Sequence, residues 1–115
     1  MKLSERRRGG LTIIDISGDL IVTENAGALK EMVLSLLQRG DRAILLNVAA
    51  LGRMDSACLG DIVASYTTTA AHGGTLKLVH VGEHLRHLLE VTNLDAIFET
   101  YETEADAIAS AGAST

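Results

Sequence analysis

Aromatic residues are scarce in this sequence of 115 residues, which contains no tryptophan, one phenylalanine and two tyrosines. A chain of this length buries roughly two-thirds of its unfolded surface, so its core must be built from aliphatic side chains. Apolar residues make up 47% of the sequence and charged residues 22%, a composition typical of a globular protein. The single cysteine excludes an internal disulfide and, with no signal peptide in view, leads us to expect a cytoplasmic protein.

Positive charge is also in short supply, since 10 lysine and arginine residues face 15 aspartate and glutamate residues and the net charge is −5. The one basic run, Arg6-Arg7-Arg8, is too short to make the clustered phosphate contacts that nucleic acid requires. No hydrophobic run approaches the ~18 residues that span a bilayer. We therefore expect neither nucleic-acid binding nor direct insertion into a membrane.

Motifs for cofactors and metals are missing as well. The sequence has neither Gly-x-Gly-x-x-Gly nor a phosphate loop, so no nucleotide or other cofactor is expected. His84 and His87 have a spacing that a metal would accept, with His80 and Cys58 as further candidate ligands. Without a Cys-x-x-Cys or His-Glu-x-x-His motif, we interpret the histidines as half-solvated residues bordering a leucine stripe. We interpret Cys58 as a small packing residue rather than a redox sensor.

Apolar runs predict a sheet of four to five strands. Gly9-Gly10 is a hairpin turn signal that joins a short polar strand near Leu3–Arg8 to a second strand, Leu11–Ile16, which closes at Gly18. Ala43–Val48 shows too little alternation to be half-exposed, which predicts a central parallel strand. Two further strands are expected at 75–81 and 97–100.

Apolar residues at spacings of three and four predict about four helices. The first is expected to be capped by Thr23 and to end at Gly40, while the second begins near Asp55 and ends at His72-Gly73. The third is expected over Glu83–Thr92. The apolar positions that should face inward on these helices are Ala26, Leu29, Val33, Leu36, Leu37, Leu59, Ile62, Val63, Tyr66, Ala70, Leu85, Leu88 and Leu89.

A capping box predicts the last helix, because Thr103 and Asp106 have the required spacing for a helix over Glu104–Ala111. Strands that alternate with helices after an opening hairpin predict an α/β sandwich with a mixed, mostly parallel central sheet. We expect a single domain over residues 1–115, with a tail at 112–115 that frays.

The pair Asp55-Ser56 follows the predicted central strand where the second helix begins. Asp55 could be an ordinary N-cap and Ser56 an ordinary first-turn residue. Alternatively, Ser56 offers a hydroxyl at the positive end of a helix dipole, where a phosphate is accommodated without unfolding. In an open α/β sheet, function usually sits at this edge. A Ser-His-Asp hydrolase does not fit, because no Gly-x-Ser-x-Gly elbow is present and Asp55, the neighbour of Ser56, cannot orient a histidine.

The stretch from Ile44 to Gly60 resembles the signature of STAS domains, the family of sulfate-transporter and anti-sigma-factor-antagonist domains. Three further segments resemble the family pattern in the same order, namely Gly18-Asp19-Leu20, His72–Val79 and Leu88–Phe98. The resemblance extends from residue 8 to residue 110, and it implies the STAS-like form of the α/β sandwich.

The resemblance implies that the protein is a bacterial anti-sigma factor antagonist. Such a protein binds an anti-sigma factor that is also a serine kinase, and it releases that partner once the kinase has phosphorylated the serine matching Ser56. A serine phosphatase then resets the cycle, so the antagonist itself has no catalytic role. The partner-binding surface implied around the helix start comprises Asp19, Ile21, Thr23, Arg53, Met54, Asp55, Ala57, Cys58 and Leu59.

Several residues depart from the family pattern and keep other functions open. Ala57 and Cys58 replace a serine and a glycine, Ile21 replaces an acid, and Arg53 stands where an apolar residue is common. Because Cys58 and Ile21 make the surface more apolar, the alternative is a STAS module that is not phosphorylated and docks permanently. Such a module would be an accessory subunit of an ABC lipid transporter or a scaffold in stress signalling. A small-ligand sensor that uses the same edge is the third hypothesis.

Overall fold

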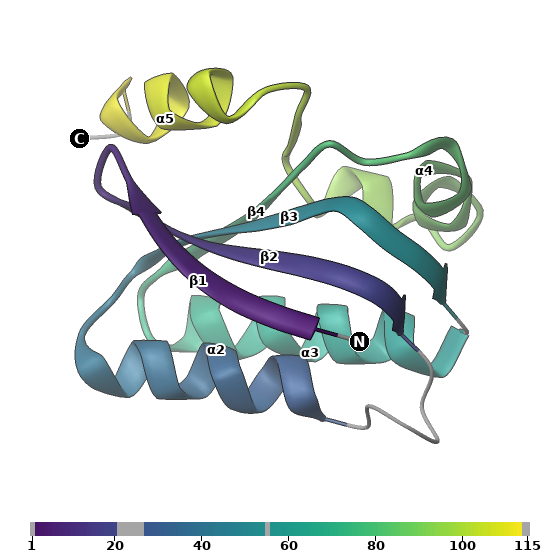
Figure 1. Ribbon diagram of the computed structural model, residues 1–115, viewed down its shortest axis with the longest axis horizontal. Coiled ribbons are helices and arrows are strands. Elements are labelled where there is room, and N and C mark those ends of the chain that lie inside the picture. Colours follow the sequence, from purple (N-terminus) through teal and green to yellow (C-terminus); the bar gives the residue numbers. More distant parts are fainter. Residues whose placement is uncertain (1, 21–26, 55, 114–115) are drawn as a thin grey trace.

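The computed structural model describes residues 2–20, 27–54 and 56–113. One five-stranded sheet with the order β1-β2-β3-β4-β5 forms its centre, with β1 antiparallel to β2 and the other neighbours parallel. Figure 1 shows α2 and α3 against one face of the sheet and α5 against the other. The elements are β1 Lys2–Arg8, β2 Leu11–Leu20, α2 Ala28–Arg39, β3 Ala43–Met54, α3 Ser56–Ala71, β4 Thr75–Val79, α4 Glu83–Val91, the 3-10 turn η1 Leu94–Ala96, β5 Thr100–Tyr101 and α5 Glu104–Ala113.

The predicted fold class is confirmed: the protein is a mixed α/β sandwich with a mostly parallel sheet, an opening hairpin and four described α-helices. The hairpin turns at Gly9 and Gly10, whose φ angles of 57° and 84° suit a two-residue turn that only glycine adopts without strain. Arg8 therefore pairs with Leu11 across the turn.

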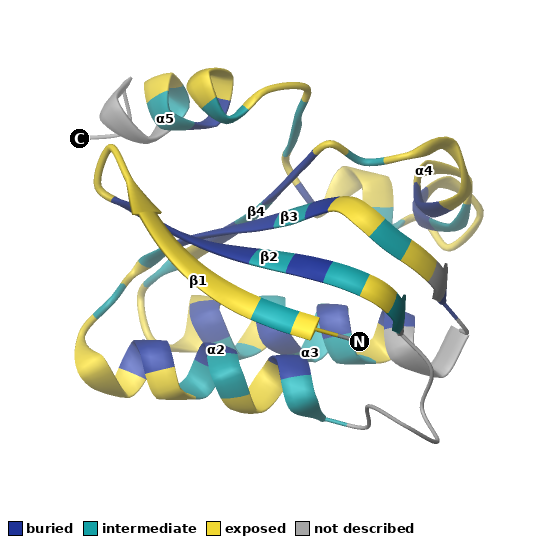
Figure 2. Cartoon of the chain, viewed as in Figure 1, coloured by how far each residue is buried: buried dark blue, intermediate teal, exposed yellow. Residues whose placement is uncertain are grey.

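The central strand is β3, which pairs with β2 on one side and β4 on the other, both in parallel. Its side chains alternate between the two faces of the sheet, as the period of a strand requires. Ile44 and Leu46 join the large apolar cluster under α2 and α3, whereas Leu45 joins a smaller cluster under α5. Both faces of β3 are thus buried over residues 44–46, which explains why the sequence there is continuously apolar. Figure 2 shows buried stretches on the central strands β2, β3 and β4, whereas the edge strand β1 is mostly exposed.

The start of α2 corrects the prediction for the first helix. The helix begins at Ala28, with Gly27 as its N-cap at φ 75°, rather than near Thr23. Thr23 and Ala26 lie outside the described residues. The cap comes from another helix, because the backbone N–H groups of Leu29 and Lys30 donate to the carboxylate of Asp61 on α3.

The inward face of α3 also differs in part from the prediction. Leu59 and Ile62 are buried as expected, but Ala70 is exposed. Ser65 and Thr69 are fully buried in its place, and their hydroxyls donate to main-chain carbonyls one turn earlier, at 2.8 Å each. This local bonding is what makes two polar side chains tolerable in the interior.

The predicted last strand is present, but its bounds of 97–100 are wrong. The chain forms η1 and then β5 at Thr100–Tyr101, while Ile97 is 45% exposed. The reason is that the side chain of Phe98 is buried in the core. Its ring packs edge-on against the ring of Tyr66, with the ring centroids 5.1 Å apart. A related difference is that β4 stops at Val79 rather than Val81.

The ends of the other elements are close to the predictions. The N-cap at Thr103 that the capping box predicts is confirmed, since the backbone N–H of Asp106 donates to the hydroxyl of Thr103 at 3.1 Å. In α4, Leu85 and Leu89 are buried while Leu88 is half-buried. Among the described helices, none combines the length and the apolar character that crossing a membrane takes.

Candidate functional site

The carboxyl ends of β2, β3 and β4 meet at one edge of the sheet, because these strands are parallel. At this edge β3 ends at Met54 and α3 begins at Ser56, so only Asp55 separates strand from helix (Figure 1). The sequence therefore predicted the position of Ser56 correctly. The first N–H groups of a helix have no intrahelical partner, so the backbone at this point suits a negatively charged group.

Several residues of the predicted surface fall where the structure gives no description. Ile21, Thr23 and Asp55 lie outside the described residues. Arg53 belongs to β3, and Ser56, Ala57 and Cys58 belong to the first turn of α3, but their side chains are not among those described. For these residues, the secondary structure is known and the roles stay predictions.

Met54 and Leu59 lie beneath the surface rather than on it. Their side chains are 8% and 5% exposed, and both belong to the large apolar cluster. Leu59 therefore anchors the first turn of α3 in the core, which corrects its assignment to the partner-binding surface. Met54 also lines a cavity that opens at the same edge, so it remains within reach of a partner.

Asp19 is an acidic residue at this edge, and its side chain lies against the end of β3. Its carboxylate comes so close to Gly52 that a Cβ atom added there would overlap Asp19 Oδ1. The pairing of β2 and β3 shifts register between Gly18 and Leu20, an irregularity that includes Asp19. Gly52 is a residue that the sequence reasoning missed, because only the packing shows that a side chain there would displace the carboxylate of Asp19.

The cavity at this edge lies between the end of β3 and the start of α4 and measures about 90 Å³. Four buried or half-buried apolar residues line it, namely Val48, Leu51, Met54 and Leu85. Four exposed residues complete the lining, namely Ala49, Gly52, Gly82 and His84. The exposed set is dominated by small residues, so the apolar floor is open to solvent.

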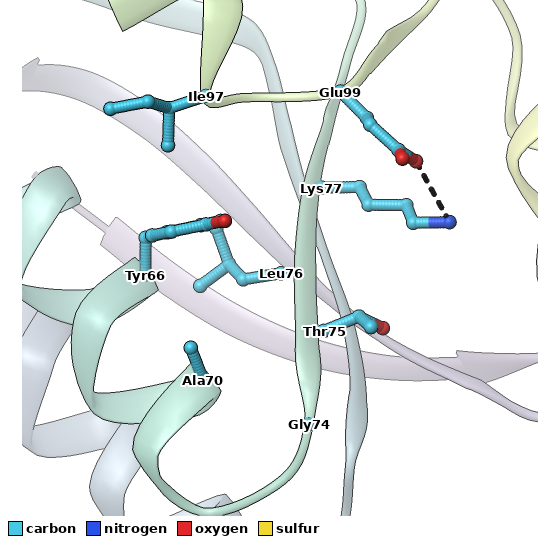
Figure 3. Close-up of a pocket in the computed structure, with 8 residues that line it drawn as sticks. All are labelled: Tyr66, Ala70, Gly74, Thr75, Leu76, Lys77, Ile97 and Glu99. Atoms are coloured by element: carbon cyan, nitrogen blue, oxygen red, sulfur yellow. Dashed lines mark ion pairs between the residues drawn. The ribbon is translucent and has the colours of Figure 1, made fainter.

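A second cavity, of about 110 Å³, lies at the opposite end of β4. Figure 3 shows Tyr66, Leu76 and Ile97 on one side of the strand, with Lys77 and Glu99 on the other. The two charged groups pair at 3.0 Å. Sites for drug-sized ligands measure about 300–1,000 Å³, so both cavities are too small for a nucleotide or a whole lipid.

The three consecutive arginines lie away from this edge and are paired within the protein. Arg6 contacts Asp15 at 2.5 Å and Glu104 at 2.7 Å, and Arg8 contacts Glu104 at 3.1 Å. Arg7 contacts Asp41 at 2.6 Å. The hydrogen bonds from Arg6 hold the pKa of Glu104 below its ordinary value of 4.5, even though burial acts in the opposite direction. These side chains fasten β1 to β2, to α5 and to the loop that follows α2, rather than forming an unpaired basic patch.

The histidines considered as metal ligands do not form a ligand cluster among the described residues. His80, His84 and His87 are all exposed, and His80 occupies a left-handed backbone conformation at φ 60°. Within the described parts of the chain, no group of three or more histidine, cysteine, aspartate or glutamate residues could hold a metal ion. The edge at Ser56 therefore stands out for its helix start, its acid and its small apolar cavity.

Comparison with known proteins gives the family. The model of the STAS domain matches residues 2–107. A protein named as a candidate anti-sigma factor antagonist from Thermotoga neapolitana is 35% identical over 86 residues, which cover 74% of this chain and 76% of that protein. The anti-sigma F factor antagonist of Paenibacillus polymyxa is 25% identical over 108 residues, covering 94% of this chain and 92% of the relative.

A solved structure supports the same assignment. The crystal structure of a candidate anti-sigma factor antagonist from Thermotoga maritima superposes with a TM-score of 0.85 at 28% identity, covering 94% of this chain and 92% of the other. Sequence and overall fold thus agree, and the chain belongs to the STAS domain family, several of whose members carry the name anti-sigma factor antagonist.

Proposed function

We propose that this protein is an anti-sigma factor antagonist, and that phosphorylation of Ser56 ends its binding to an anti-sigma factor. The observation that carries the proposal is the start of α3 at Ser56, at the carboxyl edge of the parallel strands. The named relatives support the class of partner.

A phosphate at Ser56 would change binding without unfolding the domain. At a helix N-terminus the added negative charge is stabilised by the helix dipole and by backbone N–H groups. A partner that offers a carboxylate to this surface would meet nearly two additional negative charges. With an effective dielectric near ~20, one like-charge pair at ~5 Å costs about 3 kcal/mol, which is more than a hundredfold in affinity.

In this proposal the protein is the substrate of a serine kinase and performs no catalysis. The kinase is the anti-sigma factor itself, and a serine phosphatase restores the binding form. The remaining predicted surface residues, Asp19, Arg53, Ala57 and Cys58, surround the modified serine in sequence or across the strand ends. They would determine which anti-sigma factor is recognised.

A phosphotransfer assay tests the proposal. Purified protein is mixed with ATP and, in turn, with each predicted anti-sigma serine kinase encoded in the same genome. Labelling of the wild type but not of Ser56→Ala supports the proposal and identifies the partner. If no kinase labels the protein while another protein co-purifies with it stably, the permanent interaction module described above becomes the better hypothesis.

A further inference from the structure

The cavity between β3 and α4 has the size of one side chain rather than of a free ligand. Its volume is about 90 Å³. An apolar cavity of ~150 Å³ takes up a benzene molecule, whereas pockets for drug-sized ligands start near ~300 Å³. A single branched aliphatic side chain is therefore the largest group that this cavity suits.

The chemistry of the lining also favours an aliphatic group. Leu51, Met54 and Leu85 provide the apolar floor, and Met54 and Leu85 are 8% and 5% exposed. At the mouth, Ala49 and Gly82 leave room for an incoming side chain because neither carries more than one side-chain carbon. Burying an aliphatic side chain in such a pocket removes apolar surface of both partners from water, which favours binding.

The position of the cavity connects it with the start of α3. Met54 is both part of its floor and the last residue of β3, and α3 begins at Ser56. One acidic group lies beside the mouth, because the carboxylate of Asp19 rests against Gly52, a residue of the lining. A partner segment that pairs an aliphatic side chain with a neighbouring cation is complementary to this arrangement.

We propose that the anti-sigma factor inserts one aliphatic side chain, leucine, isoleucine or methionine, into the cavity between β3 and α4. This inference rests on the proposed function, and it extends the partner-binding surface from the start of α3 to the start of α4. The inserted side chain supplies the apolar contact of the complex. A phosphate on Ser56 then weakens the binding of the anti-sigma factor through its negative charge.

Filling the cavity from within tests the inference. Ala49→Leu places an aliphatic side chain at the mouth from an exposed strand position. Gly82→Leu does the same from the other side, and its backbone (φ −78°, ψ 170°) is extended with open space around the added Cβ. Ala71→Leu is the matched control, because it makes the same change at an exposed position of α3 that lines neither cavity.

The measured quantity is the affinity of each variant for the anti-sigma factors of the same genome, by titration calorimetry. We expect Ala49→Leu and Gly82→Leu to bind at least about 10-fold more weakly than the wild type, and Ala71→Leu to bind as the wild type does. Thermal melts of all three variants show whether the fold is intact, so a variant that fails to fold is replaced by the other cavity variant.

Methionine methyl signals give a second readout that needs no substitution. The sequence has three methionines. Met54 lines the cavity, whereas Met32 packs against the main core from α2 and serves as the internal reference. With methyl-labelled methionine, we expect the Met54 signal to move when the anti-sigma factor is added and the Met32 signal to stay.

Two failures are distinguishable. If the wild type binds an anti-sigma factor, both cavity variants bind it equally well and the Met54 signal does not move, the cavity is outside the interface and this inference is wrong, while the proposed function stands. If the wild type binds none of the anti-sigma factors, the proposed function and this inference both fall.

Discussion

The two faces of the sheet are held in different ways. Under α2 and α3 lies a large aliphatic cluster that includes Ile14, Leu46 and Leu78, all fully buried. Under α5 the buried cluster is small, and α5 is held at its start by Glu104, which pairs with Arg6 and Arg8 on the edge strand β1. One face therefore depends on buried apolar area and the other partly on exposed ion pairs, which contribute far less.

This difference indicates which parts of the protein can change without loss of the fold. The apolar cluster under α2 and α3 holds β3 in place, and with it Met54 and the start of α3. On the other face, α5 packs on a small cluster, and ion pairs of Glu104 with Arg6 and Arg8 hold its first turn. We therefore expect substitutions to lower stability in an order that follows this division.

The largest effect is expected for Leu46→Ala, which removes a fully buried side chain between β3 and the two helices. The free energy of unfolding should fall by about 2–5 kcal/mol, since the tightly packed cluster cannot collapse into the cavity. Leu45→Ala, under α5, should fall in the lower part of this range because a helix held by exposed ion pairs can shift inward. Urea denaturation of both variants measures the comparison, and equal losses would mean that the two faces are equally rigid.

A smaller loss is expected for Gly9→Ala, at the tip of the hairpin beneath α5. An added Cβ would lie 2.6 Å from Ile108 Cγ2, and the φ angle of 57° already disfavours alanine. We expect a loss of about 1–3 kcal/mol. Gly10→Ala is the control, since φ is 84° there but no atom lies within 4 Å of the added Cβ. A melt in which the two variants are equally destabilised would show that the contact with Ile108 costs nothing.

The cap that α3 gives to α2 should contribute about 1 kcal/mol. Asp61→Ala removes the acceptor for the N–H groups of Leu29 and Lys30, so unfolding should become easier by that amount. Asp61→Asn keeps an acceptor and should stay close to the wild type at pH 7.

The pH dependence of the free energy of unfolding gives a second test of Asp61. Burial raises the pKa of Asp61, and Oδ2 has no hydrogen-bond partner within the described part of the structure. A raised folded-state pKa favours the folded protein at low pH, and that benefit is lost as the pH rises through this pKa. The wild type should therefore lose stability relative to Asp61→Asn between acidic and neutral pH. Denaturation curves with the opposite trend would contradict the assignment.

The smallest effect concerns Glu104 at the rim of α5. Its pKa is lowered because Arg6 and Arg8 donate to its carboxylate, so the contribution to stability is present above the ordinary pKa of 4.5 and is lost as the pH falls through the folded-state value. With Arg6 and Arg8 42% and 53% exposed, the contribution should stay below about 1 kcal/mol. Glu104→Gln should be less stable than the wild type at pH 7 and equal to it near pH 2, by urea denaturation.

Local patterns in the sequence predicted the features that depend on local physics. The continuous apolar run of β3, the glycine turn of the hairpin and the capping box of α5 were all recognised in this way. The helix start at Ser56 was predicted because an apolar strand and an N-terminal helix signal adjoin there.

Features that depend on distant partners could not be predicted. The cap of α2 comes from Asp61, and the last strand begins only at Thr100 because Phe98 turns into the core and packs against Tyr66. Glu104 meets Arg6 from nearly the other end of the chain. The extension of β2 to Leu20 was missed because its register shifts break the alternation on which strand prediction depends.

The central claim is that charge at the start of α3 switches the binding of an anti-sigma factor, and the most direct test compares three forms of Ser56. The affinities of wild type, Ser56→Ala and Ser56→Asp for the same anti-sigma factor are measured by calorimetry at one ionic strength. The account predicts that Ser56→Ala binds as tightly as the unmodified wild type, while Ser56→Asp binds at least about tenfold more weakly and the phosphorylated protein about a hundredfold more weakly. Equal affinities for all forms would contradict it.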